Sequence, residues 1–153
     1  MKKYYLAYGS NLNLERMSKL CPNSHTIFKT FLNNYRLVYK GPKKNRSYLT
    51  IEKCEGAKVP VVIYEIDNIS ELKLDSYENY PTLYYKDYFK IEINNKEINA
   101  LIYIMNDIYD YNLPSFEYLE IVKEGYENFK LDTIYLVNAL KVTIDNIPKK
   151  LIK

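Results

Sequence analysis

The sequence has few of the residues that bind metals or form disulfides. Its 153 residues include a single histidine, His25, and two cysteines, Cys21 and Cys54, with no Cys-x-x-Cys spacing. Two isolated cysteines suit neither a disulfide scaffold nor a zinc site, and one histidine excludes metal centres and mechanisms that need two. A Ser-His-Asp triad would have to use His25, which we expect to be structural or exposed. We therefore expect no metal, and a reducing compartment such as the cytoplasm.

Glycine and long apolar runs are also scarce. Of four glycines, only Gly9 lies in the turn after the first predicted strand, so this turn matches neither Gly-x-Gly-x-x-Gly nor a P-loop. The apolar stretch at the N-terminus is too short for a signal peptide or a membrane span. We therefore expect neither a nucleotide loop nor membrane insertion.

Positive charge is not concentrated along the chain. The 22 Lys and Arg residues and 19 Asp and Glu residues give a formal charge of +3, and the only basic cluster is Lys43-Lys44-Asn45-Arg46. Nucleic-acid binders normally gather their positive charge on one face or stripe. The cluster follows Gly41-Pro42 and is predicted to be a solvated loop, so we expect no nucleic-acid partner.

The chain does contain enough apolar sequence for a folded core. Apolar residues make up 47% and charged residues 27%, and nothing marks a linker, so we expect a single domain over residues 1–153. A first strand is predicted at 4–8, and successive hairpins indicate a mostly antiparallel sheet that curls or closes, hence an α+β fold. The expected hairpins pair residues 26–31 with 35–39, 48–53 with 59–66 and 84–93 with 98–105. The expected helices cover residues 14–20, 68–80 with a capping box at Asn68-Ile69-Ser70-Glu71, 115–129, and a stretch from about 132.

Two segments could carry chemistry. The turn Gly9-Ser10-Asn11 offers backbone N–H groups at a strand end, where a carboxylate or an oxyanion can bind, although the same pattern fits a plain strand-ending turn. Glu78 falls at the predicted end of a helix, just before Tyr80-Pro81, where the helix dipole disfavours a carboxylate and raises its pKa. By this pattern alone, Glu78 also fits a surface acid. Eighteen tyrosines, several crowded between residues 77 and 88, could line a polar pocket or simply pack.

Together these segments resemble one known family. Tyr8-Gly9-Ser10-Asn11-Leu12 after a first strand is similar to the signature of the γ-glutamylcyclotransferase-like family, which includes the AIG2-like proteins. The likeness continues through residues 59–66, through Leu74-Asp75-x-x-Glu78-x-Tyr80-Pro81, and through Pro114-Ser115-x-x-Tyr118-Leu119. One departure is Asn79, where the family usually has glycine after its catalytic glutamate. Asn tolerates positive φ better than most residues, so we expect the turn to survive.

The resemblance implies a small mixed, mostly antiparallel β-barrel with flanking helices. It also implies a reaction in which a γ-glutamyl amino acid or amine closes to 5-oxoproline and releases the free amino acid or amine. Glu78 would be the general acid/base, with no cofactor and no metal. The substrate would be held by Tyr8, Gly9, Ser10, Asn11 and Leu12, with Tyr84 and Tyr118 lining the pocket and donating hydroxyl hydrogen bonds.

Two alternatives stay open at this point. The substrate could be a larger γ-glutamyl conjugate, such as an isopeptide or a biosynthetic intermediate, because the leaving group lies outside the shared motifs. The protein could also be a non-catalytic binder of a small acidic metabolite, although Glu78 weighs against this because an anion site gains nothing from a buried carboxylate. The expected partner is a small γ-glutamyl substrate, and either a monomer or a homodimer fits the sequence.

Overall fold

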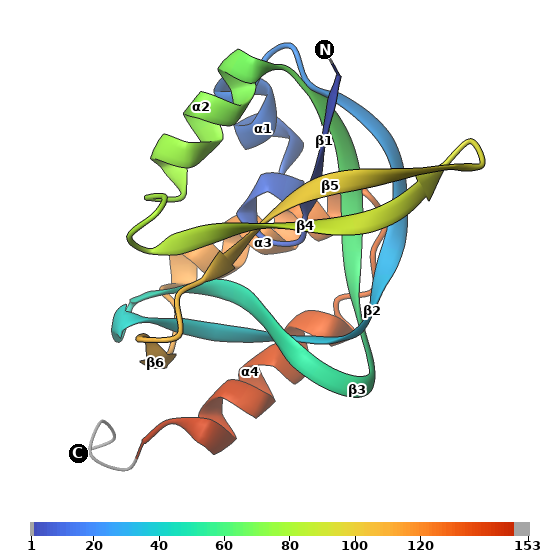
Figure 1. The fold of residues 1–153 in the computed structure, drawn as a ribbon. Helices are drawn as coiled ribbons and strands as arrows, with labels where there is room; N and C mark the ends of the chain where they lie inside the picture. The colour runs from blue at the N-terminus through green and yellow to red at the C-terminus, as the bar shows by residue number, and fades with distance from the viewer. Residues whose placement is uncertain (1, 149–153) are drawn as a thin grey trace.

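The computed structural model describes residues 2–148. Their strands form one curled six-stranded sheet in the order β4-β5-β1-β3-β2-β6, with helices beside it (Figure 1). All neighbouring strands are antiparallel except β1 and β5, which pair in parallel. The α+β class with a mostly antiparallel sheet is thus confirmed, whereas the prediction of a single domain over residues 1–153 extends beyond the described residues. The strands are β1 (Lys3–Ala7), β2 (His25–Lys43), β3 (Arg46–Ile66), β4 (Tyr84–Ile93), β5 (Lys96–Met105) and β6 (Asp110–Tyr111).

The first two predicted hairpins are wrong, because β2 and β3 are two long strands that pair with each other. Asn34 and Gly56 do adopt positive φ, at 66° and 85°, as turn residues would. Asn34 lies on β2 and Gly56 on β3, at the same irregularity in the pairing of these strands. There the Gly56 N–H donates to the Asn34 side chain at 3.1 Å. Residues with positive φ serve bulges as well as turns, so composition alone did not separate the two. The true turn lies at residues 44–45, within the basic cluster, which is exposed as predicted.

The third predicted hairpin is confirmed. Strands β4 and β5 pair in register from Tyr84 opposite Met105 to Ile93 opposite Lys96. The two connecting residues, Asn94 and Asn95, have φ values of 51° and 65°. Two successive positive φ values are typical of the tight turns that match the twist of paired strands.

The predicted helices are present, but the one predicted over residues 68–80 ends at Tyr77 and its cap also needs correction. The structure contains α1 (Leu14–Leu20), α2 (Asn68–Tyr77), α3 (Phe116–Asn128) and α4 (Ile134–Asn146). The capping box predicted at Asn68 is wrong, because the side chain of Asp67 accepts the Ser70 N–H at 2.7 Å and caps α2 one residue earlier. Glu71 is thereby free to bind lysines instead. Ser115, where a helix was predicted to begin, caps α3.

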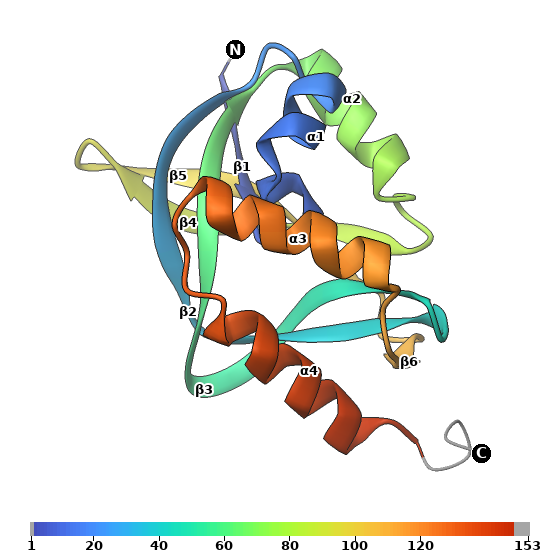
Figure 2. The ribbon, with the colours of Figure 1, turned by 180° about the vertical axis from the view of Figure 1, so that it is seen from behind.

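Helix α3, from the later part of the chain, packs against the turn after β1. In the view from behind, α3 crosses the sheet between α1 and α2 on one side and α4 on the other (Figure 2). A Cβ at Gly125 of α3 would lie 2.6 Å from the Asn13 backbone nitrogen and 2.7 Å from the Leu12 carbonyl carbon, so only glycine permits this approach. The packing fixes the turn after β1 against a rigid helix. No helix between residues 2 and 148 is long and apolar enough to span a membrane.

Candidate active site

The carboxyl group of Glu78 is positioned by the end of α2. Glu78 follows the last helical residue, Tyr77, and its N–H donates to the Leu74 carbonyl at 2.9 Å. The next residue, Asn79, turns the chain with a φ of 50°, which confirms the expectation that Asn replaces glycine in a left-handed conformation. The helix thus ends where the side chain of Glu78 enters the interior of the curled sheet.

The turn after β1 forms the opposite wall. Residues Ser10–Leu12 make a short 3₁₀ helix in which the Leu12 N–H donates to the Gly9 carbonyl and the Asn13 N–H to the Ser10 carbonyl, both at 3.0 Å. The N–H groups of Ser10 and Asn11, at the start of this turn, have no acceptor within it. Leu12 differs from Ser10 and Asn11, since its N–H is engaged and its side chain is fully buried in the core.

The turn and Glu78 meet in two connected hollows, which we call the cavity and the recess. The Asn11 Nδ2 atom lies 3.4 Å from Glu78 Oε1. The cavity, of about 240 Å³, and the recess, of about 20 Å³, share Ser10, Glu78, Tyr84 and Tyr118 as lining residues. The recess is also lined by Tyr5, Tyr8, Gly9, Asn11, Leu49 and Tyr103. Of the residues predicted for the site, only Leu12 does not line either hollow.

The pKa of Glu78 is displaced in the direction expected from the sequence. Burial raises it to about 8, while the positive charge of Arg16 opposes the rise. The dominant cause is thus desolvation rather than the helix dipole invoked from the sequence. A carboxyl group that titrates near neutral pH can both accept and donate a proton, as an acid/base catalyst must.

The tyrosine hydroxyls around the recess differ in which hydrogen bonds they have left to make. The hydroxyls of Tyr8 and Tyr84 donate to the carbonyls of Tyr103 and Leu49, at 2.6 and 2.8 Å. The Tyr118 hydroxyl instead accepts the Leu49 N–H at 3.0 Å, so its own proton can be donated into the recess. Burial raises the pKa of Tyr118, which keeps this proton in place at neutral pH.

The Tyr5 hydroxyl, like that of Tyr118, accepts a hydrogen bond and keeps its own proton to donate. It accepts a hydrogen bond from Asn11 Nδ2 at 2.9 Å, and burial raises its pKa as well. The Asn11 Oδ1 atom is buried and has no hydrogen-bond partner among residues 2–148. The recess therefore offers two hydroxyl donors and one amide acceptor to a bound molecule.

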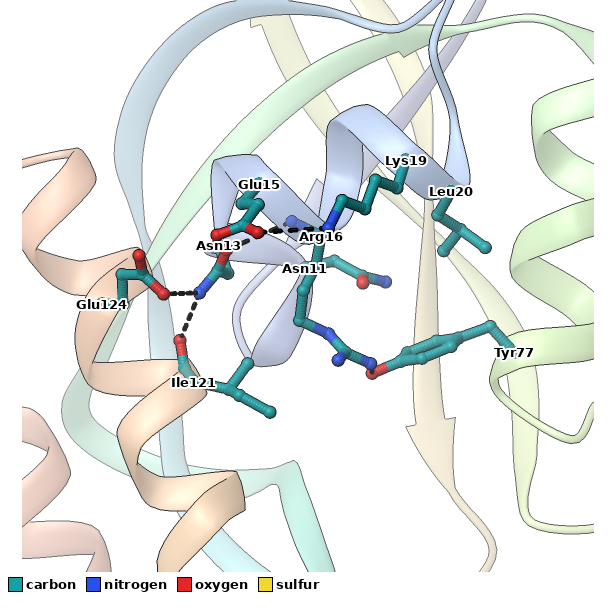
Figure 3. A pocket seen from close by; sticks show the side chains of 9 residues that line it. All are labelled: Asn11, Asn13, Glu15, Arg16, Lys19, Leu20, Tyr77, Ile121 and Glu124. Atoms are coloured by element: carbon teal, nitrogen blue, oxygen red, sulfur yellow. Dashed lines mark hydrogen bonds and ion pairs between the residues drawn. The ribbon is translucent and has the colours of Figure 1, made fainter.

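Among the residues that the sequence did not predict for the site are Arg16 and Tyr77, which line the cavity. The guanidinium of Arg16, on α1, donates from Nη2 to the Tyr77 hydroxyl at 2.6 Å, with its central carbon 5.2 Å from the ring centroid (Figure 3). The Tyr77 hydroxyl in turn lies 2.9 Å from Ser10 Oγ. Tyr77 was among the crowded tyrosines, of which Tyr80, Tyr85 and Tyr88 prove exposed. For Arg16 no local signal existed, because a charged residue on a short helix normally lies in solvent.

None of the described residues forms a cluster suited to a metal. Within residues 2–148, no group of three or more His, Cys, Asp or Glu side chains is placed to hold a metal ion. The polar groups around Glu78 are hydroxyls, amides and one guanidinium. This set suits an organic ligand with carboxylate and amine groups.

Comparison with known sequences identifies a family. The family model described as gamma-glutamyl cyclotransferase, AIG2-like matches residues 5–127, which include most of β1, the following turn, Glu78 and most of α3. No curated protein matches the chain significantly.

Solved structures share the fold over nearly the whole chain. A gamma-glutamyl cyclotransferase superposes with a TM-score of 0.77 at 23% identity, covering 91% of this chain and 86% of that one. An uncharacterized protein from Homo sapiens superposes with a TM-score of 0.76 at 24% identity, covering 90% and 86%. YkqA from Bacillus subtilis gives 0.73 at 18% identity, covering 97% of this chain and 56% of its own. At these identities the likeness establishes the curled mixed sheet with its helices.

Proposed function

Because the chain belongs to the gamma-glutamyl cyclotransferase, AIG2-like family, we propose that it converts a γ-glutamyl amino acid or amine into 5-oxoproline and the free amino acid or amine. The observation that carries the proposal is the carboxyl group of Glu78, which has a pKa of about 8 and faces the turn after β1. Family membership supports a cyclotransferase, and this geometry supports the role of Glu78.

The reaction moves two protons from one nitrogen of the substrate to the other. The α-ammonium loses one proton to become the amine that attacks the γ-carbonyl carbon, and it loses a second proton as the new C–N bond closes the ring. Glu78 accepts each proton from the α-nitrogen and passes it to the departing nitrogen, which leaves as an ammonium when the original amide C–N bond breaks. The Glu78 pKa of about 8 is close to the roughly 7.7–8.0 of a free α-amino group, so transfer in either direction costs little.

The hollows fit a substrate the size of one amino-acid unit. The cavity, at about 240 Å³, is smaller than the roughly 300–1,000 Å³ of drug-sized sites. The recess, at about 20 Å³, has room for about one oxygen atom or water molecule. We assign the glutamyl unit to the cavity and the oxyanion of the tetrahedral intermediate to the recess. There the N–H groups of Ser10 and Asn11 and the hydroxyl of Tyr118 would donate to it.

The other groups of the site orient the substrate. The unpartnered Asn11 Oδ1 would accept an N–H of the α-ammonium and hold it beside Glu78. Tyr8 and Tyr84, whose protons are donated to backbone carbonyls, would shape the walls, and Leu12 would hold the turn in place through its buried side chain. No step requires a metal or an organic cofactor, and we expect the reaction to take place in the cytoplasm.

The decisive test is release of 5-oxoproline from a panel of γ-glutamyl amino acids and amines. We expect turnover of at least one member, with stoichiometric release of its amine. If the protein binds 5-oxoproline but turns over no member, it is a non-catalytic binder and the proposal fails.

A second candidate substrate is a larger γ-glutamyl conjugate. A groove of about 520 Å³, here called the outer groove, adjoins the cavity and shares Arg16, Tyr77 and Ile121 with it. Its volume leaves room for a leaving group larger than a simple amine. Including a γ-glutamyl-lysine isopeptide in the panel separates the two candidate substrate classes. If the natural substrate is a larger conjugate, the isopeptide should be turned over efficiently and the simple γ-glutamyl amino acids and amines should not.

A further inference from the structure

The guanidinium of Arg16 lies where the cavity opens into the outer groove. Arg16 and Tyr77 line both the cavity and the outer groove, whose lining residues are drawn in Figure 3. Neither residue lines the recess beside the turn after β1. With the glutamyl unit in the cavity and its γ-carbonyl oxygen at the recess, the leaving group would extend out of the cavity, past Arg16, into the groove.

The hydrogen bonds of Arg16 leave much of its binding capacity unused. Its guanidinium has five N–H donors, and within the described part of the chain it donates only to the Tyr77 hydroxyl. Its Nε atom is buried and has no partner among residues 2–148. A buried charged donor without an acceptor is costly, and in native structures such groups are normally matched by a ligand or another polar group.

The other partly buried arginine shows what a structural guanidinium looks like in this fold. Arg36 donates from Nε to Glu52 at 2.8 Å and forms an ion pair with it at 2.6 Å. Arg16, by contrast, forms no ion pair among residues 2–148.

The two carboxylates that line the outer groove with Arg16 are engaged elsewhere. Glu15 pairs with Lys19 at 3.1 Å, and Glu124 accepts from Asn13 Nδ2 at 2.7 Å (Figure 3). Arg16 is held in place by Tyr77 and has no anionic partner of its own.

We propose that Arg16 binds the carboxylate of the leaving amino acid, so that the preferred substrates are γ-glutamyl α-amino acids rather than γ-glutamyl amines. This inference rests on the proposed function and names the substrate class of the same site. A planar guanidinium fixed through one nitrogen suits a carboxylate, because two parallel N–H groups can donate to its two oxygens. A carboxylate one carbon from the scissile nitrogen fits the position of Arg16 at the boundary between cavity and groove.

The test compares two substrates that differ only in this charge, γ-glutamyl-alanine and γ-glutamyl-alaninamide. Both carry the same glutamyl unit and side chain, so their ratio isolates the leaving-group carboxylate. We expect the parent enzyme to favour the alanine conjugate in kcat/KM by about tenfold to a hundredfold, the range of one charge-assisted hydrogen bond. Arg16→Met should reduce this preference to less than about threefold, and Arg16→Lys should restore part of it.

Each other outcome contradicts the inference in a recognisable way. Equal kcat/KM for both substrates in the parent enzyme overturns it without any variant, even if Arg16→Met does not fold. An equal loss for both substrates in Arg16→Met would mean that Arg16 serves the glutamyl unit, and a preference that persists would mean that another residue reads the carboxylate. Release of 5-oxoproline from neither substrate nor any panel member would instead overturn the proposed function.

Discussion

Two glutamates at opposite ends of α2 have opposite environments: Glu71 lies in its first turn, and Glu78 comes directly after its last residue. They are seven residues apart, or about two helical turns. Burial alone would raise the pKa of Glu71, but the ammonium groups of Lys3 and Lys86, at 2.6 and 2.7 Å, outweigh burial and lower it. Glu78 has no such partner, and burial raises its pKa to about 8. The same side chain thus anchors the helix at one position and is poised to move protons at the other.

The largest expected contrast between Glu71 and Glu78 is the effect of their substitution on turnover. Glu78→Gln removes the proton acceptor and should lower kcat by about 10²-fold or more, with the fold intact. Glu71→Gln is the matched control and should change kcat by less than about threefold, because it touches no part of the cavity. Rates of 5-oxoproline release from both variants decide this, and undiminished turnover in Glu78→Gln would show that Glu78 is not the acid/base.

The pH dependence of catalysis should show the raised pKa directly. Below about pH 8 the free enzyme holds Glu78 protonated, so kcat/KM should fall about tenfold per pH unit as the pH drops from 7 to 6. The alkaline side of the profile should follow the substrate amine. A kcat/KM that is flat between pH 5 and 7 would contradict this, because an ordinary glutamate is already ionised there.

Stability should separate the two glutamates with opposite sign. Between about pH 4.3, where glutamate ionises in the unfolded chain, and pH 8, the folded protein holds a proton on Glu78 that the unfolded chain has lost. Stability therefore falls as the pH rises through this window. Since Gln carries no charge, Glu78→Gln should stabilise the protein at pH 8 by roughly 1–3 kcal/mol, less than the full shift because the cavity is open to solvent, and by little at pH 4.

Glu71→Gln should behave in the opposite way. The lowered pKa means that ionised Glu71 contributes stability above about pH 4.3, which is lost as the pH falls through its folded pKa. The variant should lose roughly 1–2 kcal/mol at pH 7, and this loss should shrink as the pH falls below about 4.3. Chemical unfolding of both variants at three pH values tests the pair, and shifts of the same sign would mean that their environments do not differ as described.

The smallest expected effect is at the turn that aims Glu78. Asn79 has a φ of 50°, so Asn79→Gly should change stability by less than about 0.5 kcal/mol, whereas Asn79→Val should cost about 1–2 kcal/mol. Thermal unfolding gives both values. If valine is tolerated as well as glycine, the left-handed conformation does not constrain this turn.

Local patterns predicted the elements but not all of their partners. The Asn94-Asn95 turn and the start of α3 at Ser115 each depend on neighbouring residues alone, and both were predicted correctly. The end of α2 was predicted near Tyr80 and lies at Tyr77. The pairing of β2 with β3 was not predicted, because Asn34 and Gly56 have the composition of turns and form a bulge. Whether a residue with positive φ reverses a chain or bends it is decided by which strand lies beside it.

The sequence by itself determined the turn after β1, the helix end at Glu78 and the family to which both segments belong, because these depend on short motifs and on their order. Only the tertiary structure decided that burial raises the pKa of Glu78 while two lysines lower that of Glu71. It also decided that the proton of Tyr118 rather than that of Tyr84 is free, and that Arg16 lies at the mouth of the cavity. Solvation, hydrogen-bond partners and distances between remote residues follow from packing, and packing depends on residues that are far apart in the chain.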